Sequence, residues 1–267
     1  MTDTTENTNP IKEAGRVEIT CFTDPLCCWS WAFEPQWRKL RYQYAGSIAW
    51  NYVMGGLLPD WQSYHDDVNS ISRPVQMGPL WMQVHHFSGM PLADRLWMLD
   101  PPVSSYPACI AVKCAQLQSP AIAESYLRLL REAVMIHQQN ISKTQVIVAV
   151  AEKLAAVMPE FNVETFKLNL KNEIGLEAFK ADLQQVQYRN INRFPSLVIR
   201  KTGGHAVVLT GYKPFHVLED AVLQVCPGLQ KTNPDADTNS FTRYWGSALQ
   251  RELDELAAIH QTTPVVV

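Results

Sequence analysis

The feature that most constrains the fold of this chain is a pair of neighbouring cysteines, Cys27 and Cys28. Before the pair, Val17, Ile19 and Cys21 alternate with polar residues, which is the period-two pattern of a β-strand. After the pair, apolar residues recur at spacings of three and four, as on one face of a helix: Trp29, Phe33, Trp37, Leu40 and Tyr44. The two cysteines are therefore expected at a strand-to-helix turn.

Cys27 is predicted to be a nucleophile because it would lie at the start of that helix. The unpaired N–H groups and the positive end of the helix dipole favour a thiolate over a thiol. Such positions lower the pKa of a cysteine from ~8.5 toward ~3.5–7.5. The alternative is a packing role, since free cysteines are often buried as small hydrophobic residues.

The segment around the cysteines predicts a strand–helix–strand unit with parallel strands. The first strand is expected at 16–22, and the helix ends near Tyr44. Pro35 lies inside the helix and is expected to bend it, because proline lacks a backbone N–H. The second strand, 48–54, carries mostly apolar or small residues on both faces, so burial of both faces is expected.

Residues 59–190 are predicted to be almost entirely helical. The expected helices are 74–86, 91–99, 106–118, 120–138, 143–157, 163–172 and 175–189. Ser142 and Gln145 form an S-x-x-Q pattern, which is typical of a capping box at the start of a helix. Strand character returns at 196–199 and 206–209 with a glycine-containing hairpin loop between them, and a helix is expected at 214–225.

The last forty residues predict a polar linker, 231–239, and an amphipathic helix, 241–260. The apolar side chains of this helix need a surface to cover: Phe241, Trp245, Leu249, Leu256 and Ile259. That surface is expected to be the body of the same chain. A partner subunit, and so a homo-oligomer formed through this helix, is the alternative.

Composition excludes several classes of partner. The 267 residues carry a net charge of -3, which gives no attraction to nucleic acid or to an anionic membrane. No apolar run approaches the length of a membrane span. Residues 1–15 are polar and lack the layout of a signal peptide, so a cytoplasmic location is expected. Six cysteines in a chain of this length do not indicate a disulfide framework.

The order of these elements resembles the thioredoxin fold, and specifically the DsbA family, in which a helical domain is inserted before a proline loop. Three motifs carry the resemblance. Cys27, in the context Asp24-Pro25-Leu26-Cys27, resembles the first cysteine of a C-x-x-C motif. Pro35 lies at the offset of the kink proline in thioredoxin's active-site helix. Arg193-Phe194-Pro195-Ser196 resembles the cis-proline loop that faces the cysteines.

The resemblance implies an α/β fold, thioredoxin-like with a large all-helical insertion. The thioredoxin-like domain would be discontinuous and would comprise 16–58 and 191–228. The helical insertion domain would comprise 59–190. The C-terminal linker and amphipathic helix, 229–267, lie outside the resemblance.

The chain departs from the family at the second cysteine of the motif, where it has Ser30. In the dithiol mechanism that second thiol resolves the mixed disulfide, and a serine cannot do so. Ser30 is instead expected to stabilise the Cys27 thiolate by a hydrogen bond. Cys28 would form a strained ring if it resolved the disulfide. A resolving role, a packing role and a role in a soft-metal dithiol stay open for Cys28.

A substrate groove is expected beside the cysteines. A cis bond before Pro195 would leave the backbone of Phe194 free to pair with an extended peptide or with glutathione. Trp29 is a candidate wall of an apolar cleft, with core packing as the alternative. Ser104 and Ser105 would contact substrate from a loop of the insertion, or else cap a helix.

No metal site is expected. His85 and His86 are neighbours on a predicted helix and point about 100° apart, so they do not converge on one ion. No other spacing of histidine and cysteine completes a set of ligands.

The sequence thus predicts a DsbA-like thiol–disulfide oxidoreductase that acts through a single cysteine. No cofactor is expected to be bound, and glutathione or another small thiol is the expected co-substrate. A peptide or a small thiol or disulfide would be the substrate. Two alternatives stay open: a glutathione-dependent isomerase or transferase of the kappa-class type, and a non-enzymatic adaptor that presents substrates to a cytoplasmic protease such as ClpXP.

Overall fold

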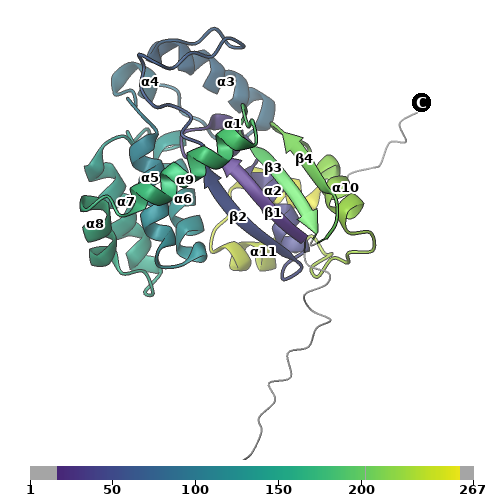
Figure 1. The fold of residues 1–267 in the computed structure, drawn as a ribbon. Helices are drawn as coiled ribbons and strands as arrows, with labels where there is room; N and C mark the ends of the chain where they lie inside the picture. Colours follow the sequence, from purple (N-terminus) through teal and green to yellow (C-terminus); the bar gives the residue numbers. More distant parts are fainter. Residues whose placement is uncertain (1–16, 202, 259–267) are drawn as a thin grey trace, which may run out of the picture.

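The sheet brings together two segments that lie far apart in the sequence (Figure 1). The computed structural model describes residues 17–201 and 203–258. Its four strands are β1 (Val17–Thr23), β2 (Ile48–Met54), β3 (Ser196–Lys201) and β4 (Ala206–Thr210), in the order β2-β1-β3-β4. β1 pairs with β2 in parallel, and the other two pairs are antiparallel. The predicted strands and the parallel unit are therefore confirmed.

The helix after the cysteines is interrupted where the sequence predicts a bend. α1 (Cys28–Ala32) ends at Phe33 and α2 (Glu34–Gln43) begins directly after it. The backbone N–H of Phe33 still donates to the carbonyl of Trp29 at 3.1 Å. Pro35 has no N–H to continue this pattern, and it lies in the first turn of α2, where proline is tolerated.

Helices cover both faces of the sheet. α2 and α10 (Phe215–Val225) pack on one face in a common hydrophobic cluster with β1 and β3. α9 (Gly175–Tyr188) crosses the other face, where Val186 packs against Phe22, Val53 and Val198 (Figure 1). The last helix before β3 is therefore part of the support of the sheet.

β2 is less buried than the sequence predicts. Asn51 is exposed and its neighbours Trp50 and Tyr52 are only partly buried. The expectation of burial on both faces is wrong because β2 is the edge strand of the sheet and has β1 as its single strand neighbour.

Between β2 and β3 the chain is helical, with one large hydrophobic core. Its helices before α9 are η1 (Pro74–Gln76), α3 (Met77–Ser88), α4 (Leu96–Leu99), α5 (Tyr106–Gln116), α6 (Pro120–Met135), α7 (Thr144–Val157) and α8 (Val163–Lys171). Segment 91–99 forms helix only over its last four residues. The predicted capping box is wrong, because Ser142 Oγ donates to the carbonyl of Ser104 and leaves α7 without a side-chain cap. Within the described chain, every helix is too short or too polar to span a bilayer.

The C-terminal segment forms two short helices, α11 (Thr238–Trp245) and α12 (Gln250–Ala257), where one long helix is predicted. Gly246 separates them and has a left-handed backbone with φ of 74°, which ends α11. The apolar residues Phe241 and Leu256 are buried against Tyr42 of α2. The described part of this segment therefore covers its own chain, as predicted; residues after 258 lie outside the described ranges.

Buried ion pairs fasten α12 to the body of the protein. Glu252 is fully buried and pairs with Arg38 of α2 at 2.6 Å and with Arg128 of α6 at 2.6 Å. Burial acts to raise the pKa of Glu252, but the charges of Arg128 and Arg38 outweigh it and the pKa is lowered. Glu252 is therefore ionised at neutral pH and joins the C-terminal segment to the helix that follows the cysteines.

Replacing Glu252 with alanine is expected to lower the free energy of unfolding by about 3–5 kcal/mol, because buried Arg38 loses its ion-pair partner. Urea unfolding measures the change. The matched control is Glu177→Ala, whose pair with Lys180 is exposed and is worth less than about 1 kcal/mol.

The same pair predicts a pH dependence. A carboxylate with a lowered pKa in the folded state contributes its stability fully above its unfolded pKa of ~4.3, and that stability is lost as the pH falls through the folded value. A difference between wild type and Glu252→Ala that persists unchanged into strong acid would contradict this assignment.

Candidate active site

Cys27 is the N-cap residue of α1, and its sulfur takes the place of a capping oxygen. The backbone N–H of Ser30 donates to Sγ of Cys27 at 3.3 Å. Cys27 itself has extended backbone geometry, and its carbonyl accepts the N–H of Trp31, the first bond of the helix. The strand-to-helix turn thus directs an unpaired helix N–H at the sulfur, as the sequence predicts.

The proline loop lies against the same sulfur. The peptide bond between Phe194 and Pro195 is cis, as predicted. The thiol of Cys27 donates to the carbonyl of Phe194 at 3.6 Å. This contact follows from the antiparallel pairing of β1 with β3, whose register sets Phe22 opposite Ser196. The structure therefore brings Cys27, Ser30, Phe194 and Pro195 together.

Burial raises the pKa of the Cys27 thiol, whereas its position at the start of a helix predicts a lowered pKa. The residue is 5% exposed, and loss of water raises the pKa of its thiol. The side chain and the backbone N–H of Ser30 act in the opposite direction, as does the charge of Arg131, but together they do not offset burial. The expectation of a lowered pKa is wrong for this arrangement, because desolvation outweighs the helix N-terminus.

Cys28 lies in a different environment from Cys27. It is the first residue of α1 and is 3% exposed, in the core shared with Leu26, Trp31 and the helical segments. Burial raises the pKa of the Cys28 thiol well above its ordinary value, and the nearby Cys27 adds to the effect. This environment supports the packing role among the roles that the sequence leaves open for Cys28.

Three aromatic rings from separate segments meet beside the cysteine turn. Trp29 lies 5.5 Å from Phe87 and 6.3 Å from Tyr212 between ring centroids. Phe87 is 61% exposed, and Trp29 is only partly buried. Trp29 therefore forms part of an apolar surface next to Cys27. Phe87 and Tyr212 had no signal in the sequence, since neither belongs to a motif.

The two serines of the insertion have structural roles. Ser105 is fully buried, and its hydroxyl donates to Asp24 at 2.8 Å and accepts the N–H of Leu58. Substrate contact predicted for Ser105 is therefore wrong. Ser104 accepts the N–H of Tyr106 and donates to the carbonyl of Leu58, so it shapes the turn before α5. The N-cap residue of α5 is Ser105, and its side chain makes no capping hydrogen bond.

Asp24 fixes the start of the cysteine turn, a role that the sequence analysis missed. Its buried carboxylate accepts the N–H groups of Leu26 at 2.8 Å and Leu57 at 2.7 Å. It also accepts hydrogen bonds from Ser105 and from the thiol of Cys109. Its place in the Asp-Pro-Leu-Cys motif was the available signal, because aspartate before a turn commonly accepts backbone N–H groups.

A small cavity of about 10 Å³ lies directly behind the site. Its walls include Ser30 and Pro195 from the site and, beneath them, Glu34 of α2 and Arg131 of α6. Arg131 pairs with Glu34 and donates to Thr23 at the end of β1. An ion pair from two distant helices therefore underlies the cysteine turn.

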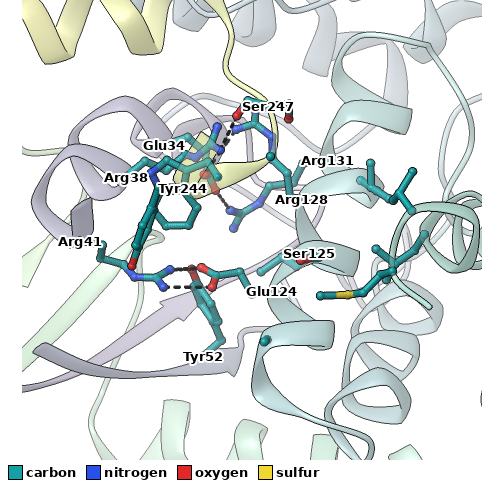
Figure 2. A pocket seen from close by; sticks show the side chains of 18 of the residues that line it. Glu34, Arg38, Arg41, Tyr52, Glu124, Ser125, Arg128, Arg131, Tyr244 and Ser247 are labelled. Carbon is teal, nitrogen blue, oxygen red and sulfur yellow. Dashed lines mark hydrogen bonds and ion pairs between the residues drawn. The ribbon is translucent and has the colours of Figure 1, made fainter. Parts of the chain in front are cut away.

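A larger cavity of about 780 Å³ opens beyond this ion pair (Figure 2). Its walls carry four arginines and three glutamates: Arg38, Arg41, Arg128, Arg131, Glu34, Glu124 and Glu160. Each guanidinium is already paired with a glutamate, as in the Arg41–Glu124 pair of Figure 2. Arg38 and Arg128 share Glu252, so every one of these guanidinium groups already has a carboxylate partner, and the cavity does not specify an anionic ligand. Among the described residues, no group of three or more histidine, cysteine, aspartate or glutamate side chains is placed to hold a metal ion.

In this structure a cysteine at the start of a helix faces a cis-proline, beyond the end of a central strand of a helix-covered sheet. This arrangement is typical of thioredoxin-type thiol proteins. The chain belongs to the thioredoxin family: residues 21–220 match the family described as "Thioredoxin". The predicted thioredoxin-like fold with helical segments between the strands is confirmed by this match and by structural relatives.

The chain is similar to the ClpXP adapter protein SpxH of Halalkalibacterium halodurans, with 27% identity over 208 residues. The match covers 77% of this chain and 66% of that protein, so the chain spans slightly less than two thirds of its length.

Two solved structures share the fold. A putative protein disulfide isomerase from Nitrosomonas europaea has a TM-score of 0.60 and 20% identity, over 79% of this chain and 95% of that one. The cytosolic disulfide reductase DsbM from Pseudomonas aeruginosa, determined with GSH, has a TM-score of 0.55 and 14% identity, over 86% of this chain and 97% of that one. At these identities the likeness concerns the fold.

Gly55 is predicted to be essential for the proline loop. A β-carbon at this position would lie 2.0 Å from Cζ of Phe194, so Gly55→Ala must displace that ring. We expect a loss of about 1–3 kcal/mol in unfolding free energy, the usual cost of overpacking, with altered reactivity of Cys27. Urea unfolding and thiol alkylation measure the two effects. Gly78→Ala, which meets nothing closer than 3.7 Å, is the control and should be neutral or stabilising.

The thiol of Cys27 is predicted to titrate above the ordinary cysteine value of ~8.5, and Ser30→Ala should raise the midpoint further. Burial disfavours the thiolate, and the variant removes a group that stabilises it. The measurement is the rate of Cys27 alkylation against pH, with the modified peptide quantified by mass spectrometry. An unchanged midpoint in Ser30→Ala would show that the serine has no part in the ionisation.

Proposed function

We propose that this protein is a thiol–disulfide oxidoreductase that acts through Cys27, with glutathione or another small thiol as co-substrate. The observation that supports this most is the position of Cys27 Sγ, between the Ser30 N–H at 3.3 Å and the Phe194 carbonyl at 3.6 Å. The thiolate of a cysteine held between a helix N-terminus and the backbone of an adjacent loop can attack a disulfide aligned along that loop.

The reaction runs in two exchanges. The Cys27 thiolate attacks one sulfur of a substrate disulfide, forms a mixed disulfide, and releases the other sulfur as a thiolate. A glutathione thiolate then attacks the mixed disulfide, takes the bound sulfur into a new disulfide, and returns Cys27 as a thiolate. Each step forms one S–S bond and breaks one. Ser30 cannot perform the second step, so an external thiol is required.

Ser30, the proline loop and the aromatic surface have distinct roles in this scheme. Ser30 favours the thiolate that each exchange produces: its N–H donates to the sulfur at 3.3 Å, and its side chain lowers the pKa of the Cys27 thiol. Phe194 and Pro195 orient the incoming disulfide, and the surface of Trp29, Phe87 and Tyr212 receives its apolar parts. Cys28 is not needed, because it is packed in the core with a strongly raised pKa.

The DsbM neighbour supports the small-thiol part of the proposal, since its structure contains GSH. A reducing compartment would supply glutathione in its reduced form. The glutathione-dependent isomerase or transferase alternative requires non-covalent binding of glutathione rather than exchange with Cys27.

A second candidate function is that of a substrate adaptor for a protease. The relative from Halalkalibacterium halodurans is named a ClpXP adapter protein, which favours this candidate. An adaptor needs a binding surface, such as that of Trp29, Phe87 and Tyr212, and does not need a second cysteine. The serine at position 30 in place of the resolving thiol is therefore compatible with both functions.

Turnover separates these candidates. In a disulfide-exchange assay with glutathione, the wild-type protein should exceed the rate of glutathione alone, and Cys27→Ser should fall to that background rate. Cys28→Ala is the matched control and should retain most of the activity, because it changes a neighbouring buried cysteine. Intact-mass measurement should show one glutathione adduct that disappears in Cys27→Ser.

Turnover no greater than that of free thiol would overturn the oxidoreductase proposal and favour the adaptor. Reversible binding of glutathione with no covalent adduct would favour the isomerase or transferase alternative.

A further inference from the structure

The small cavity behind the site contains an unexplained pair of polar atoms. Oγ of Ser30 and Nε of Arg131 are both buried, and within the described part of the chain neither has a hydrogen-bond partner. Both residues line the same cavity. Buried polar atoms in native proteins are almost always paired, with protein or with ordered water. Two such atoms at one cavity therefore indicate a common partner.

The orientation of Arg131 is fixed by its other contacts. One terminal nitrogen of the guanidinium binds Glu34 and the other binds Thr23, and the side chain is almost completely buried. Because the guanidinium is planar, these two bonds fix the direction of the remaining Nε–H.

The size of the cavity fits a single water molecule. A volume of about 10 Å³ is close to the minimum of ~10–15 Å³ that one water requires, and such a water needs two to four polar neighbours. The Nε–H of Arg131 would donate to this water, and the hydroxyl of Ser30 would exchange a hydrogen bond with it. The Ser30 hydroxyl would then be held in place beside Sγ of Cys27.

The charges around Cys27 show why this cation matters. Asp24 raises the pKa of the Cys27 thiol, and the charge of Arg131 lowers it. Cys28, Cys21 of β1 and Tyr64 of the loop before η1 interact electrostatically with Cys27 as well, and none of them is a cation. Glu34 neutralises part of the field of Arg131 through their ion pair.

We propose that Arg131, supplied by helix α6, is a positioning residue for Cys27, which acts through one buried water and the Ser30 hydroxyl to favour the thiolate. This inference rests on the proposed function of Cys27 as a nucleophile. Its test uses alkylation without substrate, so it can fail or succeed independently of turnover.

The first experiment measures the alkylation of Cys27 against pH in full-length protein with Cys28→Ala. Cleavage before aspartate then releases the peptide 24–59, in which Cys27 is the single cysteine. Arg131→Gln should raise the midpoint by about one pH unit, which is about a tenfold loss of thiolate at a fixed lower pH. In a Ser30→Ala background the same substitution should shift the midpoint by less than half as much. Arg131→Lys retains the charge and should recover part of the shift.

Two further variants keep the test interpretable. Arg131→Gln leaves Glu34 with a weaker set of partners and can impair folding, so the charge-balanced double variant Arg131→Gln/Glu34→Gln is measured beside it and should show the same direction of shift. Arg128→Gln is the matched control. Arg128 lies on the same helix and faces the same Glu34 at 3.5 Å, but it does not line the small cavity. Its midpoint should stay within about 0.3 pH units of the parent.

Three results would overturn the inference. One is an unchanged midpoint in folded Arg131→Gln and in the double variant. Another is an equal shift with and without the Ser30 hydroxyl, since Arg131 would then act on Cys27 directly. The third is a high-resolution crystal structure without ordered water between Ser30 Oγ and Arg131 Nε. If these tests succeed while disulfide exchange fails, the proposed function falls and the role of Arg131 stands.

Discussion

The antiparallel pairing of β1 with β3 is the constraint on which the site depends. β1 ends at the cysteine turn, and β3 begins after the proline loop. Antiparallel pairing of the two strands therefore places the turn and the loop at the same end of the sheet. The register sets Phe22 opposite Ser196, and the thiol of Cys27 then reaches the carbonyl of Phe194. The intervening helical segments contribute α9, which packs on one face of the sheet and supports this pairing.

The cysteine turn shows two opposing electrostatic effects. The helix N-terminus and Ser30 favour the thiolate of Cys27, whereas its burial favours the thiol, and burial dominates. A thiol of this kind remains largely protonated at neutral pH until a substrate or a conformational change alters its surroundings. A mostly protonated thiol is compatible with a selective exchange reaction and also with a binding role. The geometry around Cys27 is therefore compatible with both candidate functions.

The polar face of α2 shows how the C-terminal segment contributes to the site. Glu34, Arg38, Lys39 and Arg41 are all buried, although charged residues are seldom buried without partners. The C-terminal segment covers part of this face with α12 and supplies Glu252, and α6 supplies further arginines. Glu252, which lies outside the match to the thioredoxin family, pairs with Arg128, and Arg128 lies 3.5 Å from Glu34 of the ion pair under the cysteine turn.

The strands, the parallel unit and the bend near Pro35 followed from the residues alone, because alternation, helical spacing and the missing N–H of proline are local properties. The cis bond before Pro195 was predicted from the resemblance to the DsbA family. The sequence also placed Cys27 at a helix start beside Ser30. The tertiary structure alone decided how buried Cys27 is, that Ser105 binds Asp24, and that Arg131 and Glu34 meet behind the turn. These three features depend on contacts between segments that lie far apart in the chain. Local sequence patterns do not indicate which distant residues come into contact or how much water those contacts exclude.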